Sequence, residues 1–334
     1  MSELKIALLG MDAMTTSIGL ALKQYQAKGG MHQFKIHGYD LEDQKSHDAK
    51  KAEALDANHK YMDAAVKDAD IVVMNLSFDQ LRLAYKEISQ HIREGALILD
   101  MSPLIKSSIQ WHTDYLTEEQ HLIGMNPVLK SSALNRDLFL VENASADLFQ
   151  SATVLLCPSA SNISSAVELA VNFIKILGAN VQFIDPQEYD VLNSYSSHLP
   201  ELLNATLLYY LRQSQGWDDI QKLTDSVLAQ STQFLWHKHP DALRDLWLAA
   251  SSNLVHGLDE YIVLLQQIRK AIANQDTDTL EGLSQSSVQT YIEWYRNREV
   301  QAWDKPTQPI ESKGSFLGSL IGEKWAKKLS GSDE

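Results

Sequence analysis

Short apolar segments alternate with helical segments through the first half of this chain, and this alternation limits its fold more than any other feature. Strands that are separated by helices pair into a parallel sheet with helices on both faces. We expect strands at residues 5–9, 34–39, 71–75, 96–100, 121–125, 153–157 and 180–185. The sequence therefore predicts an N-terminal, doubly wound α/β domain that ends near residue 185.

The pattern changes after Asp185, where strand signals stop and apolar residues recur at steps of three and four as far as Tyr295. That period is typical of amphipathic helices. We therefore expect an α/β domain at 1–185, an all-helical domain at 186–303, and a polar linker with an amphipathic tail at 304–334. The tail helix at 316–329, which Phe316 begins and Leu329 ends, either docks on its own domain or is frayed, or else it binds a protein partner or is weakly attracted to a membrane.

Composition argues against several classes of function. A formal charge of −14 is unfavourable for binding nucleic acid. No apolar run reaches the length of a membrane span and no leader-like segment opens the chain, so we expect a cytoplasmic protein. The single cysteine, Cys157, excludes an intrachain disulfide, and its apolar neighbours predict a buried, unreactive thiol. His237 and His239 have no nearby acidic residue, so we expect a solvated loop there and no metal site.

The segment "IALLGMDAMTTSIGLALK" at 6–23 has the outline of a dinucleotide-binding turn. Gly10 ends the first strand where a tight turn is needed, and the following helix directs its N-terminal amides towards a pyrophosphate. Asp40 ends the second strand, where a carboxylate accepts hydrogen bonds from the adenosine ribose. An acidic residue there favours NAD over NADP, because it repels a 2′-phosphate.

Two residues of the same turn argue against cofactor binding. Asp12 stands where the second glycine lets the backbone approach the pyrophosphate, and Thr15 replaces the third glycine. A carboxylate a few ångströms from a phosphate costs about 1 to 4 kcal/mol. Asp12 or Thr15 can instead cap the helix, so that the chain satisfies its own anion site. Retained binding and abolished binding therefore both remain open.

Several segments resemble the prephenate and arogenate dehydrogenases of tyrosine biosynthesis. They are "GYDLED" at 38–43, "ADIVVMNLSFDQL" at 69–81, "GALILDMSPLIKSSI" at 95–109, "LGANVQFIDPQEYDVLNSYSSHLPELLNATL" at 177–207 and "LRDLWLAASSNLVHGLDEYI" at 243–262. The resemblance covers residues 4 to 295. It implies a Rossmann-type domain with a mostly parallel sheet, then an all-α domain that forms a homodimer, with the active site in the cleft between them.

The resemblance also implies site residues. Asn126 stands where the family has a histidine that accepts a hydrogen bond from the ring hydroxyl of the substrate, and His198 and Ser102 match two further catalytic positions. Asparagine accepts such a bond but cannot take the proton. The implied contacts of NAD are Gly10, Ala13, Met14, Asp40, Leu76 and Ser77.

Two departures concern the charge of the substrate. Glu201 replaces a family histidine, and a carboxylate there is expected to repel a dicarboxylate such as prephenate. No arginine lies near Phe234, where the resemblance places a substrate-binding one.

Three hypotheses therefore stand. The chain is an NAD-dependent dehydrogenase for prephenate, arogenate or a related compound; or it is an enzyme on the same scaffold with a less anionic substrate. Alternatively, it is a dimeric binding or scaffold protein without catalysis.

Overall fold

The computed structural model describes residues 3–159 and 161–303 and forms two compact units. The first unit holds residues up to Leu254 apart from the short segment Lys130–Ser132, and the second holds that segment and the described residues from Val255 onwards. The predicted tail lies outside the described residues. Among the helices of the described part, none is long and apolar enough to span a membrane.

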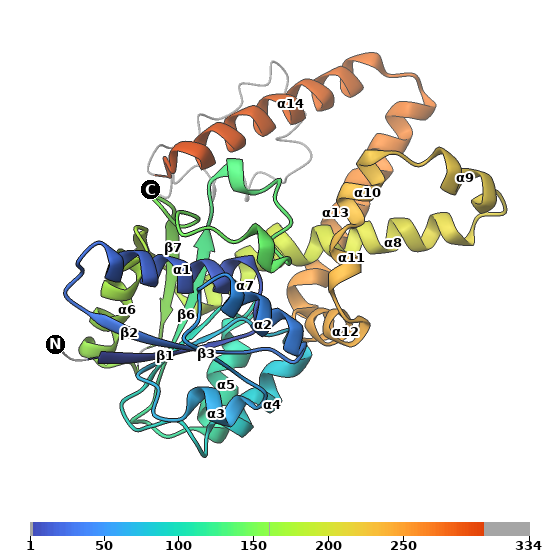
Figure 1. The fold of residues 1–334 in the computed structure, drawn as a ribbon. Helices are drawn as coiled ribbons and strands as arrows, with labels where there is room; N and C mark the ends of the chain where they lie inside the picture. The colour runs from blue at the N-terminus through green and yellow to red at the C-terminus, as the bar shows by residue number, and fades with distance from the viewer. Residues whose placement is uncertain (1–2, 160, 304–334) are drawn as a thin grey trace, which may run out of the picture. The chain divides into compact units, whose positions relative to one another are not determined.

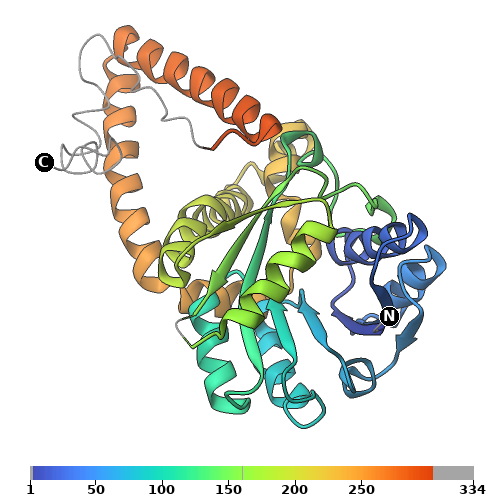
Figure 2. The same ribbon diagram turned by 90° about the vertical axis from the view of Figure 1, so that its left-hand side faces the viewer.

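One eight-stranded sheet organises the first unit (Figures 1 and 2). Its strands are β1 (Glu3–Leu9), β2 (Gln33–Tyr39), β3 (Ala57–His59), β4 (Ile71–Met74), β5 (Leu97–Asp100), β6 (His121–Val128), β7 (Thr153–Pro158) and β8 (Asn180–Phe183). Their order is β3-β2-β1-β4-β5-β6-β7-β8, and every pair is parallel except β6 with β7. The order reverses between β1 and β4, and ligands of such sheets bind beyond the carboxyl ends of the strands at that point.

Helices cover both faces of the sheet, and after β8 the described elements are all helices. They are α1 (Ala13–Ala27), α2 (Asp43–Lys51), α3 (Met62–Val66), α4 (Phe78–Ile88), α5 (Ile105–Tyr115), α6 (Ser164–Ile176), α7 (Pro186–Asn193), α8 (Leu199–Gln213), α9 (Trp217–Leu223), α10 (Ser226–Thr232), α11 (Phe234–His237), α12 (Pro240–Ala249), α13 (Ser251–Ala273) and α14 (Thr277–Val300). Short 3₁₀ turns occur at Ser131–Ala133 and Val141–Asn143, and a π-helical turn, Ser194–His198, joins α7 to α8.

Two apolar cores lie on opposite faces of the sheet. Ile18 and Leu22 of α1 pack with Phe173 of α6 on one face, where β-strand residues such as Leu8 meet them. The other core contains α3, α4 and residues of α12 and α13, among them Leu254. The predicted doubly wound sheet and the helical second half are therefore confirmed.

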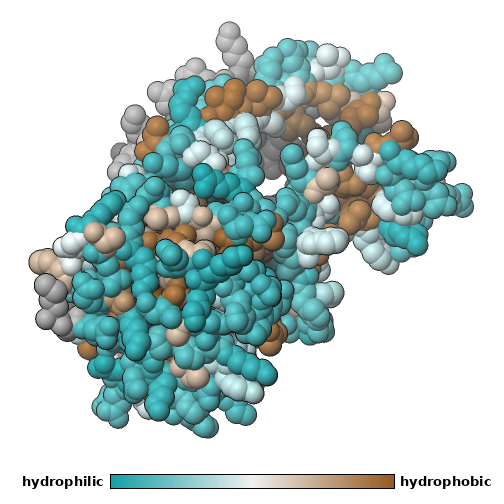
Figure 3. Space-filling model, viewed as in Figure 1, coloured by the Kyte–Doolittle hydropathy of each residue, from teal (hydrophilic) through white to brown (hydrophobic). Residues whose placement is uncertain are grey.

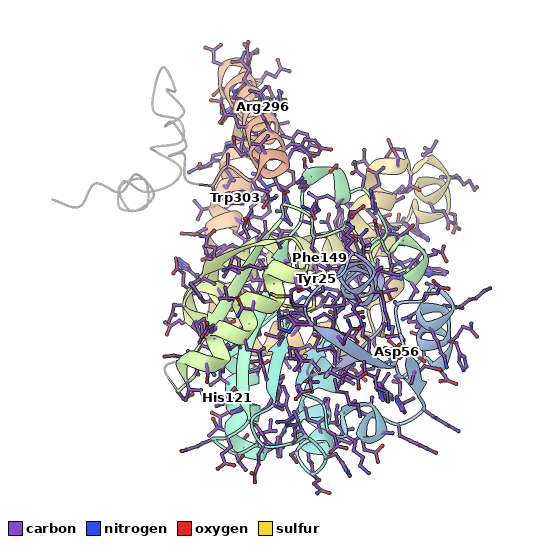
Figure 4. The ribbon with its side chains drawn as sticks, turned by 60° about the vertical axis from the view of Figure 1, so that its left-hand side comes forward. Tyr25, Asp56, His121, Phe149, Arg296 and Trp303 are labelled. Carbon is purple, nitrogen blue, oxygen red and sulfur yellow. The ribbon has the colours of Figure 1, made fainter. Side chains whose placement is uncertain are left out.

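The edge strand β3 was not predicted, because its three residues, Ala57–His59, are only half-buried and carry no apolar run. It is held at the sheet edge by Asp56, whose carboxylate accepts a hydrogen bond from the amide of Ile36 at 2.7 Å. Asp56, which is labelled in Figure 4, also forms an ion pair with Lys23 of α1. A short strand of this kind is specified by contacts that are remote in sequence.

The second unit contains most of α13 and all of α14, which are joined by a turn at Asn274–Asp276. Several large apolar side chains of these helices are exposed, including Ile262, Ile272, Val288 and Tyr291. Figure 3 shows hydrophobic side chains along α14. Helices with exposed apolar surface of this kind are typical of surfaces that bind another protein.

Candidate active site at the carboxyl ends of the strands

The turn after β1 has room only for glycine. Gly10 has a φ of +83°, and a Cβ atom on it would lie 2.1 Å from the carbonyl oxygen of Asn75 after β4. The amide of Gly10 donates to the carbonyl of Tyr39 at 2.9 Å. The ends of β1, β2 and β4 therefore converge at the switch point of the sheet, as the sequence predicts.

Asp12 caps α1, and its carboxylate occupies the anion site at the N-terminus of that helix. The Oδ1 atom of Asp12 accepts the amide of Thr15 at 2.9 Å, and the Thr15 hydroxyl accepts the amide of Asp12 at 3.0 Å. The Oδ2 atom accepts the side-chain amide of Asn75 at 2.7 Å. Burial raises the pKa of Asp12, while these hydrogen bonds and one from the amide of Met14 oppose the rise. The predicted cap is therefore confirmed, and both residues share it.

A second acceptor reaches the same helix end from the connection between β6 and β7. The carbonyl of Leu138 accepts the amide of Ala13 at 3.0 Å. Leu138 also packs on the core that contains α1. The first amides of α1, which bind pyrophosphate in a dinucleotide site, thus all have acceptors within the protein.

Asp40 lies beside this turn, with both carboxylate oxygens in use. Oδ2 accepts the amide of Met11 at 2.6 Å and Oδ1 accepts the amide of Glu42 at 2.8 Å. Burial raises the pKa of Asp40, and the two amide bonds oppose that rise. Leu76 packs near Gly10, and the hydroxyl of Ser77 has no hydrogen-bond partner among the described residues.

Ser102 follows β5 in a buried turn. Its amide donates to Oδ1 of Asp100 at 2.9 Å, and its hydroxyl lies 3.2 Å from both the amide and the carbonyl of Leu104. Tyr85 donates to the other oxygen of Asp100 at 2.7 Å. The Ser102 hydroxyl therefore stabilises its own turn in this conformation.

Hydrogen bonds connect this turn to the start of the helical half. The carboxylate of Asp190 on α7 accepts the amides of Ile105 at 2.6 Å and Lys106 at 3.1 Å, and so caps α5. Asn193 donates from Nδ2 to the carbonyl of Pro103 at 2.9 Å. These bonds fix α7 against the carboxyl end of β5.

Asn126 lies on β6 opposite Leu155 of β7. Its Nδ2 atom donates to the hydroxyl oxygen of Tyr189 on α7 at 2.6 Å. Tyr189 is buried, and burial together with nearby Cys157 and Asp190 raises its pKa above the ordinary range. The phenol therefore stays neutral and acts as a fixed hydrogen-bond partner of Asn126.

His198 is the last residue of the π-helical turn that precedes α8. The turn allows Pro200, which has no N–H and crowds the preceding turn, to follow without ending the helix. Nε2 of His198 lies 3.3 Å from Nδ2 of Asn193, which is a donor, so the ring proton is assigned to Nδ1. Nδ1 is buried and has no partner among the described residues. Burial, and then the charge of Lys238, lowers the pKa of His198 to about 4, so the ring is neutral at pH 7.

The chain is similar to known proteins over most of its length. Residues 18–183 match the family profile "Prephenate dehydrogenase, nucleotide-binding domain", and residues 185–285 match "Prephenate dehydrogenase, dimerization domain". This chain belongs to the prephenate dehydrogenase family. The match begins at Ile18, so the turn with Gly10 and Asp12 precedes it.

Individual relatives agree with this assignment. Prephenate dehydrogenase of Bacillus subtilis (strain 168) is 24% identical over 285 residues, which are 84% of this chain and 74% of the relative. Cyclohexadienyl dehydrogenase of Zymomonas mobilis is 22% identical over 218 residues, 65% of this chain and 72% of the relative.

Solved structures show the same fold. Prephenate dehydrogenase of A. aeolicus, in complex with hydroxyphenyl propionate and NAD⁺, has a TM-score of 0.71 at 18% identity, covering 88% of this chain and 99% of that one. Synechocystis arogenate dehydrogenase has a TM-score of 0.63 at 16% identity, covering 87% of this chain and 100% of that one.

This family member carries a charge pair that the sequence did not reveal. Glu201 in the first turn of α8 forms an ion pair with Lys238, which follows α11. The Nζ atom of Lys238 also lies 5.9 Å from the centroid of the Phe234 ring. The sequence predicts that Glu201 repels a dicarboxylate, and the structure adds a positive charge directly beside that carboxylate. Lys238 supplies a positive charge in the segment near Phe234, where the resemblance places a substrate-binding arginine that this chain lacks.

His237 was also placed wrongly. Its Nε2 atom lies 3.1 Å from Oδ2 of Asp137, and its ring stacks on Phe139 with centroids 4.4 Å apart. His239, by contrast, is exposed and accepts the amide of Asp241 at the start of α12. Within residues 3–159 and 161–303, no group of three or more His, Cys, Asp or Glu side chains is arranged to hold a metal ion.

Cys157 behaves as predicted. It is buried on β7, and burial, together with the negative charges of Asp190 and Asp185, raises its pKa to about 12. A thiol in this state is a packing residue.

Proposed function

We propose that this chain is a nicotinamide-dependent dehydrogenase that oxidises a cyclohexadienol acid of the prephenate or arogenate type with loss of CO₂. One observation carries the proposal beyond family membership. The turn after β5 and the end of β6 are hydrogen-bonded to α7 through Asp190, Asn193 and Tyr189, and Nδ2 of Asn193 lies 3.3 Å from Nε2 of His198. Three segments that bear the candidate catalytic residues therefore meet at one place.

The reaction sets what the site must do. Hydride leaves the ring carbon that bears the hydroxyl, the bond to the ring carboxylate breaks, and its electron pair completes the aromatic ring as CO₂ departs. The dinucleotide supplies the acceptor for the hydride. The hydroxyl keeps its proton in the phenol product, so the chain must provide a hydrogen-bond acceptor for it and need not provide a base.

Residues of the chain can fill these roles. The Oδ1 atom of Asn126 accepts a hydrogen bond from the substrate hydroxyl. Neutral His198 donates to the substrate from Nδ1, which has no partner among the described residues. Lys238 attracts a substrate carboxylate, with Glu201 limiting its net charge. Ser102 contacts substrate or nicotinamide after its hydroxyl leaves the Leu104 backbone.

The adenosine ribose and the pyrophosphate of the cofactor would meet different surroundings in this site. Asp40 fits an adenosine ribose at the end of β2, and its charge favours NAD over NADP. The amides of Ala13 and Met14 fit a pyrophosphate only after the Leu138 carbonyl and the Asp12 carboxylate give way. Gly10, Leu76 and Ser77 line the same edge.

We also propose a cytoplasmic homodimer. The second family profile describes a dimerization domain, and exposed apolar side chains on α13 and α14 support that assembly.

The test is complementation of a bacterium that lacks its own prephenate-type dehydrogenase and requires tyrosine. Growth without tyrosine is expected for the chain and not for Asn126→Ala. Absence of growth at a normal level of folded protein contradicts the proposal. It then favours a dimeric binding protein without catalysis, for which the self-occupied end of α1 is the supporting observation.

A further inference from the structure

The contact between Asn126 and Tyr189 joins two elements that are 63 residues apart. Asn126 is half-buried at the carboxyl half of β6, and Tyr189 is 4% exposed on α7. At 2.6 Å between Nδ2 and the phenol oxygen, the bond is short for an N–H donor.

The position of the phenol is fixed by its surroundings. Tyr189 packs with Ile105 and Cys157 in a small apolar cluster. The neighbouring residue, Asp190, ties α7 to the N-terminus of α5 through two amide hydrogen bonds. The phenol oxygen therefore offers an acceptor at a constant place.

In this structure the nitrogen end of the Asn126 carboxamide faces the fixed phenol oxygen. A carboxamide carries its donors on nitrogen and its acceptor on oxygen, and the two ends exchange by rotation about the last side-chain bond. With Nδ2 bound to the phenol, Oδ1 is turned away from Tyr189 and accepts no hydrogen bond from the described residues. Tyr189 stays protonated because burial raises its pKa, so it cannot compete as an anion for a ligand proton.

We infer that Tyr189 is a positioning residue, which orients Oδ1 of Asn126 to accept a hydrogen bond from the ring hydroxyl of the bound substrate. This inference rests on the proposed function for the identity of the ligand. Tyr189 itself acts through Asn126.

The test measures ligand binding, which needs no hydride transfer. Calorimetry gives the affinity of the purified full-length protein for 3-(4-hydroxyphenyl)propionate and for 3-phenylpropionate, which lacks the hydroxyl. One additional hydrogen bond predicts that the hydroxyl compound binds about three- to ten-fold more tightly. Tyr189→Phe keeps the ring but removes the fixed acceptor, so the ratio should fall close to one.

Tyr25→Phe is the matched control. The hydroxyl of Tyr25, a residue of α1 that is labelled in Figure 4, accepts the amide of Met31 at 3.2 Å, and its loss should leave the ratio unchanged. Asn126→Ala and the double variant Asn126→Ala/Tyr189→Phe should match Tyr189→Phe. A general loss of structure weakens both ligands, so the affinity for 3-phenylpropionate, which should keep its wild-type value, reports such a loss separately from the ratio.

The outcomes separate this inference from the proposed function. An unchanged ratio in Tyr189→Phe overturns the inference, as does a wild-type ratio of one. A double variant with a lower ratio than either single variant also overturns it, because Tyr189 then acts directly. If Tyr189→Phe lowers the ratio of the two affinities to one while the wild-type protein turns over no substrate, the inference stands and the dehydrogenase proposal fails.

Discussion

Replacing Asp12 with asparagine should tighten the binding of NAD⁺. The carboxylate accepts the amide of Thr15 at the end of α1 where a pyrophosphate binds, and asparagine caps a helix as well as aspartate does. The variant therefore removes a charge and keeps the cap through Oδ1, while the Asn75 carboxamide must turn over to accept from the new amide nitrogen. Folding stability should change by less than about 1 kcal/mol.

The magnitude follows from Coulomb's law. Two unit charges about 4 Å apart repel by about 1 kcal/mol in water and about 4 kcal/mol near a protein surface. Removing that repulsion should lower the dissociation constant by about 5-fold to about 1000-fold. Burial already raises the pKa of Asp12, and a phosphate raises it further, so wild-type affinity should increase as the pH falls. Asp12→Asn should abolish that dependence.

The assay is a calorimetric titration with NAD⁺ at several pH values. Asp48→Asn is the control, because Asp48 is an exposed residue of α2 and its loss changes the net charge by the same amount. If Asp12→Asn and Asp48→Asn bind NAD⁺ equally, Asp12 does not face the pyrophosphate and the reasoning is refuted.

Three further predictions concern stability and substrate. Burial lowers the pKa of His37 and of His198 to about 4, so the unfolded chain binds more protons than the folded one between about pH 4 and 6.5. Urea unfolding should therefore show a loss of stability on the order of 3 kcal/mol per histidine as the pH falls through that range. The variant His37→Gln should make this pH-dependent loss smaller. Lys238→Met should raise KM for prephenate about ten-fold or more, whereas Lys238→Arg should retain most activity; equal KM values in both variants would exclude a carboxylate contact. Gly10→Ala should lower the free energy of unfolding by about 2 kcal/mol or more in denaturant titration, because its φ of +83° and the Asn75 carbonyl leave no space for Cβ, and an unchanged value would show that the turn can rearrange.

The fold was predictable because its signals are local. Each long strand is an apolar run bounded by turn residues, and Ile6, for example, pairs with both Ile36 and Ile71 in the middle of the sheet. The cap at Asp12 is also local, since aspartate followed three residues later by threonine suits a reciprocal cap. The short edge strand β3 has no such signal.

Much of the site depends on contacts between residues that are distant in the chain. The Leu138 carbonyl reaches Ala13 from the β6–β7 connection, Lys238 pairs with Glu201, and Tyr189 holds Asn126. Each residue type is unremarkable where it stands in the sequence. Only the positions of the helices bring an acceptor to an amide or a cation to a carboxylate, so charge and hydrogen bonding at this site required the structure.

Hydride transfer from a cyclohexadienol acid can be measured in a single turnover, with the protein in excess over prephenate or arogenate and NAD⁺ at millimolar concentration. We predict that absorbance at 340 nm rises until NADH equals the substrate added, with an equal amount of CO₂ released. No NADH with either substrate, from folded protein that binds NAD⁺, would contradict the proposed dehydrogenase activity.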